Sequence, residues 1–554
     1  MRVWTPENEL AQSADRSGMC MRRSLNWVDL LGLGVGGMVG AGVFVTAGVA
    51  ASSRAGPAVI LSFVVAGFAA LLSAFCCMEF AVELPTAGGA FSYIGISLGE
   101  FAAFITGANL VVEYVISNAA VARTFTAYLA SLLGYAPDTW LLKVPALFSH
   151  GFYFLDFPAL LLVILLTLSI CYSTRSSSQL NLAMTVGHVV LIAVVVAAGV
   201  VNGKVQNLVS AGSPDKRRGF LPFGVDGVFD GAAIVYFSFI GFDAVSTMAE
   251  EVKHPARNLP IGIAGSVLLV TVLYSAMAAA LCMLLPYDQI DMKAPFSSAL
   301  KGVVVQWRWV AGIVQVGACL GILTSLLVAM LGQARYLCAI ARSRLIPSWL
   351  AKVDDNSSTP LRSSLVLGVV TGMCALVVDT WVLLDLISIG TLFVFYMVAN
   401  ALIFRKHVRA GVTNPAPTAA FLAATTALSL SFLAFWQMRS CHLCRTIGLP
   451  CSFAALLAST SAFAALVPPV DRPVVLSWQA PCMPWLAVLS IFVNVFLAGS
   501  LGPLAFCRFG AWSLLALLFY VGYGVHSAHD AEEESAGALP THGLDKALQC
   551  NQQS

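Results

Sequence analysis

Long apolar runs separated by short polar segments make up most of this chain. Each run is long enough to form a helix across a bilayer, which takes about 20 apolar residues. The pattern therefore predicts an all-α polytopic membrane protein with about 14 transmembrane helices. The runs cover residues 27–50, 57–82, 100–133, 157–174, 179–202, 228–249, 261–285, 309–340, 363–379, 381–404, 418–437, 447–467, 484–502 and 508–526.

The composition supports this prediction. Of the 554 residues, 58% are hydrophobic and 10% are charged, whereas soluble chains carry roughly 25% charged residues. A water-soluble protein is therefore excluded. The 30 basic and 28 acidic residues are spread along the whole chain, so no basic face can neutralise a nucleic acid backbone. We expect the lipid bilayer as a partner and no nucleic acid.

Both ends of the chain are polar. Residues 1–24 contain four arginines but no short apolar core with a cleavage site, so we expect a cytosolic tail and no cleaved signal peptide. Residues 528–554 lack apolar periodicity and are expected to form a disordered cytosolic tail. Lys and Arg are more frequent in loops on the side of the termini, and the positive-inside rule then predicts that both termini are cytosolic.

Most of the 14 cysteines lie inside apolar runs, where cysteine behaves as a small hydrophobic residue. We therefore expect no disulfide framework. Cys441, Cys444 and Cys451 lie near His442, but no second histidine stands at ligand spacing. Neither a metal nor another cofactor is expected.

Two apolar runs carry helix-breaking residues near their middle. The first run contains four closely spaced glycines, and the sixth contains Gly241 beside Asp243. The two runs lie five spans apart, which suggests two inverted halves of five helices followed by four more, with a transport site at the breaks. The glycines are Gly36, Gly37, Gly40 and Gly42.

The glycines of the first run allow two interpretations. Small residues at four-residue spacing permit close helix packing inside a membrane. Alternatively, the segment is unwound, and its N–H groups beside a half-helix N-terminus bind a carboxylate. In the sixth run, Asp243 can cap the second half-helix, which frees the carbonyls of Phe237 to Ile240 for an ammonium group. A purely structural cap is compatible with that role.

Two further polar residues lie deep in apolar runs. Glu113 in the third run is a candidate functional residue, because an intramembrane carboxylate is costly unless it has a role. Its alternative is a stabilising contact with a neighbouring helix. His188 in the fifth run is either a proton site or a hydrogen-bonded structural histidine.

Several sequence blocks carry a resemblance to a known family. They are Ala55–Val59, Glu79–Pro85, Ala87–Tyr93, Glu113–Ile116, Ala120–Arg123, Gly241–Arg257, Gly332–Tyr336 and Ser388–Phe393. These blocks resemble the cationic amino acid transporters of the amino acid, polyamine and organocation superfamily. Their residues are most similar to those of plant members. The resemblance extends from Arg22 to about His529.

The resemblance implies a ten-helix core over residues 25–405 with LeuT-type inverted repeats at about 25–205 and 226–405, followed by four additional helices over 406–527. It also implies a substrate site. The implied carboxylate-binding turn consists of Val39, Gly40, Ala41 and Gly42. The implied ammonium-binding carbonyls belong to Phe237, Ser238 and Ile240, beside Asp243, and Phe237 is the implied aromatic gate.

Glu113 and His188 are then assigned to charge selectivity or coupling. The resemblance puts His188 where sodium-coupled relatives hold a cation and proton-coupled relatives hold a lysine. The expected function is a secondary active permease for cationic amino acids, such as arginine, lysine or histidine, that works by alternating access. It is either a proton symporter or a carrier driven by membrane potential and the substrate gradient.

Other functions remain open at this point. A neutral or broad-range amino acid carrier and an amino acid sensor are both compatible with the same fold. An enzyme is not expected, because the sequence contains no HExxH, GxSxG or CxxC…CxxC pattern. The plasma membrane is the first expectation for location, with a vacuolar membrane or another endomembrane as the alternative.

Overall fold

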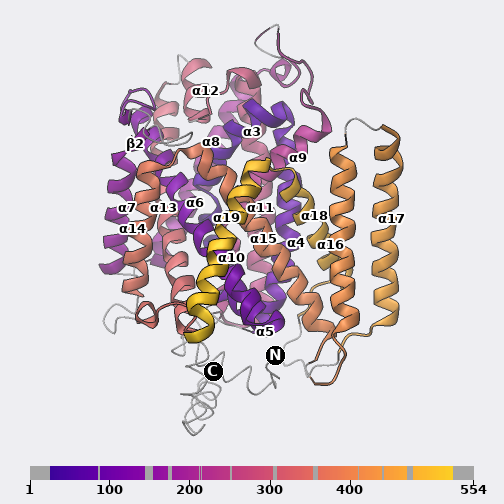
Figure 1. The fold of residues 1–554 in the computed structure, drawn as a ribbon. Coiled ribbons are helices and arrows are strands. Elements are labelled where there is room, and N and C mark those ends of the chain that lie inside the picture. Colours follow the sequence, from indigo (N-terminus) through magenta and orange to yellow (C-terminus); the bar gives the residue numbers. More distant parts are fainter. Residues whose placement is uncertain are drawn as a thin grey trace.

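The computed structural model of the chain is almost entirely helical, and its helices stand side by side in one bundle (Figure 1). Helices α16 and α17 lie at one edge of that bundle (Figure 1). The structure describes residues 25–84, 88–143, 154–172, 177–210, 213, 215–249, 252–292, 294–303, 308–352, 360–409, 411–438, 442–470 and 478–527.

The helices and strands follow one another in three groups. The first group is α2 (Trp27–Met38), α3 (Ala41–Ala50), α4 (Val59–Glu83), α5 (Gly89–Leu98), α6 (Glu100–Leu132), α7 (Phe157–Tyr172) and α8 (Ser177–Asn202), with the antiparallel strands β1 (Leu141–Lys143) and β2 (Phe154–Asp156) between α6 and α7. The second is α9 (Gly224–Val235), α10 (Phe242–Ser246), α11 (Pro255–Leu284), α12 (Pro295–Val303), α13 (Arg308–Arg342), α14 (Leu361–Val377) and α15 (Thr380–His407). The third is α16 (Ala416–Gln437), α17 (His442–Leu466), α18 (Trp485–Gly499) and α19 (Pro503–Phe519).

Each of the fourteen apolar runs overlaps at least one of these helices. Within the described residues, ten helical stretches are long and apolar enough to cross a membrane. The helices α7, α14 and α18 are apolar but shorter, and α9 and α10 are two parts of an interrupted helix. The prediction of an all-α polytopic membrane protein is therefore confirmed, whereas the count of fourteen spans stays a prediction.

The structure also contains two helices that the apolar runs do not predict. Helix α5 lies between α4 and α6, and helix α12 lies between α11 and α13. In addition, the first two runs are joined without a loop, because a π-helical turn over Ala51–Ala55 and a 3-10 turn over Gly56–Ala58 connect α3 to α4.

Both helices that carry central glycines are interrupted. Helix α2 ends at Met38, and α3 begins at Ala41, after Val39 and Gly40. Helix α9 continues as the 3-10 turn η4 (Tyr236–Phe239), and α10 begins after Gly241. Gly241 has φ +127°, a conformation that side chains with a Cβ rarely adopt. The glycine therefore fixes the position of the second break.

Helix α6 lies at the centre of the packing and contacts α13, α14 and α15. Arg123 on α6 is buried and donates hydrogen bonds to the carbonyls of Val378 at 2.7 Å and of Phe154 at 3.3 Å. Its guanidinium also forms an ion pair with Asp379 at 3.5 Å. A buried charge needs such partners, so Arg123 ties the end of α14 and strand β2 to α6.

One cysteine bears on the expectation that the chain has no disulfide framework. Cys444, near the start of α17, is disulfide-bonded. The ten other described cysteines are free, and seven of them lie partly or fully buried. A single bonded cysteine is not a disulfide framework, so that expectation stays a prediction for the chain as a whole.

Candidate functional site

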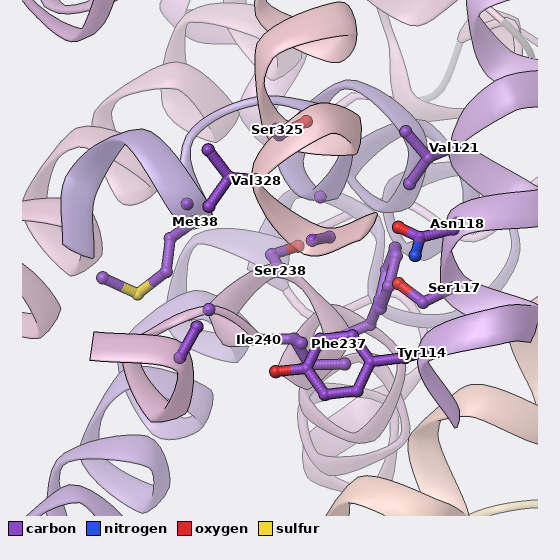
Figure 2. A pocket seen from close by; sticks show the side chains of 15 residues that line it. Met38, Tyr114, Ser117, Asn118, Val121, Phe237, Ser238, Ile240, Ser325 and Val328 are labelled. Carbon is purple, nitrogen blue, oxygen red and sulfur yellow. The ribbon is translucent and has the colours of Figure 1, made fainter. Parts of the chain in front are cut away.

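A small cavity lies where the two helix breaks meet α6 and α13. The α6 side chains Ser117, Asn118 and Val121 lie on one side of it, across from Met38 and Val328 (Figure 2). The cavity is lined by Gly37, Met38, Gly42, Tyr114, Ser117, Asn118, Val121, Phe237, Ser238, Ile240, Gly241, Ala244, Ser325, Val328 and Ala329.

The two breaks approach each other through backbone rather than through side chains. A Cβ added to Gly42 would lie 2.4 Å from the Cα of Ser238, and one added to Gly241 would lie 2.9 Å from the carbonyl carbon of Gly37. Both distances are too short for any side chain. Thr46 supports the contact, since its hydroxyl lies 2.8 Å from that of Ser238. Glycine at these positions is thus required for the breaks to meet.

The four residues of the predicted carboxylate turn have different environments. Gly42 lines the cavity. Val39 is fully buried, and a Cβ on Gly40 would lie 2.3 Å from Ser325 Oγ on α13. Ala41 is the first residue of α3. Both interpretations of the glycine run therefore apply: Gly40 allows close packing on α13, and Gly42 lies at an unwound break beside a cavity.

Tyr274 on α11 connects the two breaks. Its hydroxyl donates to the carbonyl of Met38 at 2.5 Å and lies 3.2 Å from the carbonyl of Ser238. In addition, Ile240 N–H donates to the carbonyl of Phe237 at 3.1 Å. Two of the three carbonyls that the resemblance assigns to an ammonium group thus already accept a hydrogen bond. A carbonyl has two lone pairs, so each can still accept a second donor.

Asp243 lies behind the cavity rather than on its surface. Its carboxylate accepts hydrogen bonds from Tyr114 at 2.7 Å, from Gly241 N–H at 3.1 Å and from Tyr336 at 3.4 Å. The bond to Gly241 holds the backbone of the second break. The prediction that Asp243 caps the second half-helix is wrong, because Gly241 is the N-cap of α10 and Asp243 is the second residue of that helix. Tyr114 separates the carboxylate from the cavity, because the Tyr114 ring is part of the lining.

Glu113 is buried between α6 and α15. It accepts a hydrogen bond from Thr391 at 2.5 Å, its Oε2 atom has no hydrogen-bond partner among the described residues, and it packs against Gly390. Glu113 is not part of the cavity lining. It therefore faces α15, one residue away from Tyr114, which faces the cavity.

His188 is buried on α8 and faces α13. A Cβ on Gly321 would lie 2.6 Å from His188 Nε2, and a Cβ on Gly40 would lie 2.8 Å from the carbonyl oxygen of Gly321. Gly321 thus lies between His188 and the first break. The Nδ1 atom of His188 has no hydrogen-bond partner among the described residues.

Sequence reasoning missed several polar residues at the site. Ser117, Asn118 and Ser325 line the cavity, and Asn118 Nδ2 donates to Gln333 on α13 at 2.9 Å. The Oδ1 atom of Asn118 has no partner among the described residues. In the sequence, each of them is a neutral polar residue inside an apolar run. Such a residue indicates a functional site less strongly than a charged residue does. No group of three metal-ligating side chains occurs among the described residues.

A helical membrane bundle with a cavity between two broken helices has the architecture of a transporter. The family model for amino acid permeases matches residues 25–443, and a second, described as the C-terminus of AA_permease, matches residues 478–528. The chain belongs to the amino acid permease family. It is accordingly a multi-pass membrane transporter and not an enzyme.

Curated relatives confirm the resemblance to cationic amino acid transporters. The chain is 52% identical to "Cationic amino acid transporter 6, chloroplastic" of Arabidopsis thaliana over 99% of the chain and 93% of that relative. It is 40% identical to "Cationic amino acid transporter 1" of the same plant over 94% of the chain and 86% of the relative. It is also 36% identical to the "Methylthioribose transporter" of Bacillus subtilis (strain 168), over 71% of the chain and 84% of the relative.

The contact between the breaks predicts the effect of a side chain at Gly42. Gly42→Val should abolish uptake, because the added Cβ would force the two breaks apart. Immunoblots of membrane fractions should show normal amounts of the variant. Gly312→Val is the matched control, since nothing lies within 4 Å of a Cβ at Gly312. Normal uptake by Gly42→Val would show that Gly42 is not part of the substrate site.

The position of Tyr274 predicts the effect of removing its hydroxyl. Tyr274→Phe should lower uptake about tenfold, because a buried carbonyl that loses its donor costs about 1–3 kcal/mol. Initial rates of uptake, normalised to the amount of protein in the membrane, measure the effect. Tyr396→Phe is the control, because its hydroxyl bonds to Thr426, which is not part of the cavity lining. Equal rates for the two variants would contradict a role for Tyr274.

Proposed function

We propose that this permease carries cationic amino acids, such as arginine, lysine and histidine, across a membrane by alternating access at the cavity between the two helix breaks. The observation that carries the proposal is the exposure of backbone from both breaks to one cavity. Such a site recognises the α-amino and α-carboxylate groups that every amino acid shares. The similarity to relatives named cationic amino acid transporters supports the choice of substrate.

The backbone groups at the two breaks suit a zwitterion. The start of α3, at Ala41 and Gly42, presents N–H groups without partners in the preceding turn, and the positive end of the helix dipole favours a carboxylate there. The turn from Phe237 to Ile240 presents carbonyls, which favour an ammonium group. The two ends of the substrate's backbone therefore bind to different breaks.

The side chain of the substrate is directed toward α6 and α13 in this proposal. Asn118 Oδ1 is an acceptor without a partner among the described residues, and Ser117 and Ser325 supply hydroxyl groups beside it. A guanidinium or ammonium group offers several N–H donors to these acceptors. The cationic side chain would thus be solvated by neutral polar groups rather than by a carboxylate.

Selection for positive charge then depends on carboxylates behind the cavity wall. Asp243 is separated from the cavity by Tyr114, and Glu113 is the residue before Tyr114 on α6. At an effective dielectric constant near 20, a carboxylate several ångströms away still favours a cation by about 2 kcal/mol. We therefore assign Glu113 to charge selectivity or coupling.

A neutral or broad-range amino acid carrier is the second candidate. The observation that favours it is the lining itself, which contains no carboxylate among its described residues. The third candidate is a sensor that binds an amino acid without transporting it, because a sensor needs the same cavity.

Uptake into proteoliposomes separates these candidates. Radiolabelled arginine should enter with saturable kinetics and show counterflow. Lysine should compete with arginine, whereas glutamine and alanine should not. Equal competition by all three amino acids would identify a broad-range carrier, and binding without counterflow would identify a sensor.

The fold also supports a proposal for the organisation of the chain. We propose inverted repeats over about 25–205 and 226–405, with four additional helices over 406–527, and the presence of one break in each half, at α2–α3 and at α9–α10, supports this proposal. The domain boundaries, the fourteen spans and the cytosolic location of both tails are part of this proposal. The first 24 residues and residues 528–554 lie outside the described residues.

The membrane in which the carrier works is a separate question. The first expectation from the sequence is the plasma membrane, but two relatives that are 52% and 51% identical are named chloroplastic. A relative that is 38% identical is named vacuolar. The two higher identities favour a chloroplast membrane, and the location of a fluorescent fusion in plant cells measures it directly.

The assignment of Glu113 to charge selectivity predicts a substrate-dependent loss. Glu113→Gln keeps an oxygen that can accept the Thr391 hydroxyl but removes the charge. Arginine uptake should therefore fall by about tenfold more than uptake of a neutral amino acid. Thr391→Val is the control for the hydrogen bond alone. An equal loss for both substrates would mean that Glu113 is structural or couples transport to an ion.

The environment of His188 allows a proposal of proton coupling. Histidine changes charge near neutral pH, and His188 contacts the segment of α13 that packs on the first break. Uptake should rise as external pH falls from about 7.5 to about 5.5, and His188→Asn should lose most of this dependence. His526→Asn, at an exposed position, is the control. An unchanged pH profile in His188→Asn would favour transport driven by membrane potential and the substrate gradient.

A further inference from the structure

Gln333 on α13 is a buried amide beside the cavity. Only 1% of its surface is exposed, and it is not part of the cavity lining. Its Oε1 atom accepts a hydrogen bond at 2.9 Å from Nδ2 of Asn118, which is fully buried on α6. Since α6 and α13 pack against each other, this bond joins two side-chain amides at the contact between the helices.

The bond to Gln333 determines which end of the Asn118 amide borders the cavity. A side-chain amide has an N–H donor group at one end and an acceptor oxygen at the other. Because Nδ2 is bound to Gln333, the end left for the cavity is the oxygen. Asn118 lines the cavity, and its oxygen points from α6 toward the side of Ser325 and Val328 (Figure 2). That oxygen has no hydrogen-bond partner among the described residues.

Gln333 also opposes a reversal of the Asn118 amide. Reversal of Asn118 alone would break the bond of 2.9 Å and would bring the oxygens of the two amides against each other. Two acceptors that face each other in a buried site are costly, because neither has a donor and little solvent screens them. The acceptor end of Asn118 is therefore held on the cavity side by a residue that does not line the cavity.

An acceptor oxygen at this position distinguishes a charged side chain from a neutral one of the same shape. The guanidinium of arginine has N–H donors and no acceptor, and hydrogen bonds from a charged donor are roughly twice as strong as neutral ones. Citrulline has nearly the same length and shape, but its ureido group is neutral and carries a carbonyl oxygen. The oxygen of Asn118 thus favours arginine, whereas an N–H group there would favour the citrulline carbonyl.

We propose that Gln333 is a positioning residue that makes this permease select arginine over citrulline, because it holds the Asn118 oxygen toward the side chain of the substrate. This inference rests on the proposed function, in which the cationic side chain is directed toward α6 and α13. Asn118 contacts the substrate, and Gln333 acts through Asn118. Part of the selection for a cation is then due to the orientation of a neutral amide, in a cavity whose described lining contains no carboxylate.

Uptake of radiolabelled arginine and of radiolabelled citrulline into proteoliposomes tests this role. The readout is the ratio of the two initial rates, because a merely structural defect lowers both rates together. The wild-type protein should prefer arginine. Gln333→Met keeps the length of the side chain but removes the acceptor, so the Asn118 amide can turn. The ratio of arginine to citrulline uptake should then fall at least about tenfold.

A second substitution should restore the preference for arginine. A carboxylate offers acceptor oxygens only, so Asn118→Asp presents an acceptor to the cavity in either orientation. The double variant Asn118→Asp/Gln333→Met should therefore have at least the wild-type ratio. Gln315→Met is the matched control and should keep the wild-type ratio. Gln315 is also a buried amide on α13, but it donates to Ser297 at 2.6 Å and does not line the cavity.

The outcomes separate this inference from the proposed function. Absence of saturable arginine uptake by the wild-type protein would contradict the proposed function itself. Saturable arginine uptake with an unchanged ratio in Gln333→Met would overturn only the role of Gln333, as would an equal fall of the ratio in Gln315→Met. A wild-type preference for citrulline would also overturn it, because the amide nitrogen would then face the substrate. If Gln333→Met fails to fold, Asn118→Leu decides, since a wild-type ratio without the Asn118 oxygen would contradict the proposal.

Discussion

The close approach of two interrupted backbones is the constraint on which the site depends. Gly42 meets Ser238, and Gly37 meets Gly241, at distances that leave no room for a side chain. Both segments are also interrupted at this contact, so their N–H and carbonyl groups are not all bonded within a continuous helix. The same contact that demands glycine therefore leaves polar backbone beside the cavity. Tyr274 stabilises this arrangement from α11 by bonding to carbonyls of both segments.

The buried carboxylates lie near the cavity but are not part of its wall. Asp243 is satisfied by two tyrosines and a backbone N–H, and Glu113 is bound by Thr391. These contacts reduce the cost of holding carboxylates in a membrane. They also leave a cavity wall of hydroxyl, amide and apolar groups. Under the proposed selectivity for cations, a cation in the cavity would be favoured by the electric field of these carboxylates rather than by an ion pair, so it could leave again.

The sequence predicted those features that depend on local chemistry. Glycines within an apolar run, and Asp243 beside Gly241, mark both breaks because few other roles account for them inside a membrane. The sequence could not show that Glu113 faces α15, because helical spacing alone does not say which helix is the neighbour. Tyr274 and Asn118 were missed for a related reason, since a tyrosine or an asparagine in an apolar run is compatible with many packing roles. Helices α5 and α12 were missed because each is too short to appear as a span.

Competition by arginine analogues tests the central claim that the two breaks recognise the backbone of an amino acid. Agmatine keeps the guanidinium of arginine but lacks the carboxylate, and N-acetylarginine keeps the carboxylate but lacks the ammonium group. Inhibition of radiolabelled arginine uptake by each analogue is measured in proteoliposomes. Neither analogue should compete at concentrations at which unlabelled arginine abolishes uptake of the label. Competition by agmatine as strong as that by arginine would contradict the account, because recognition would then depend on the side chain alone.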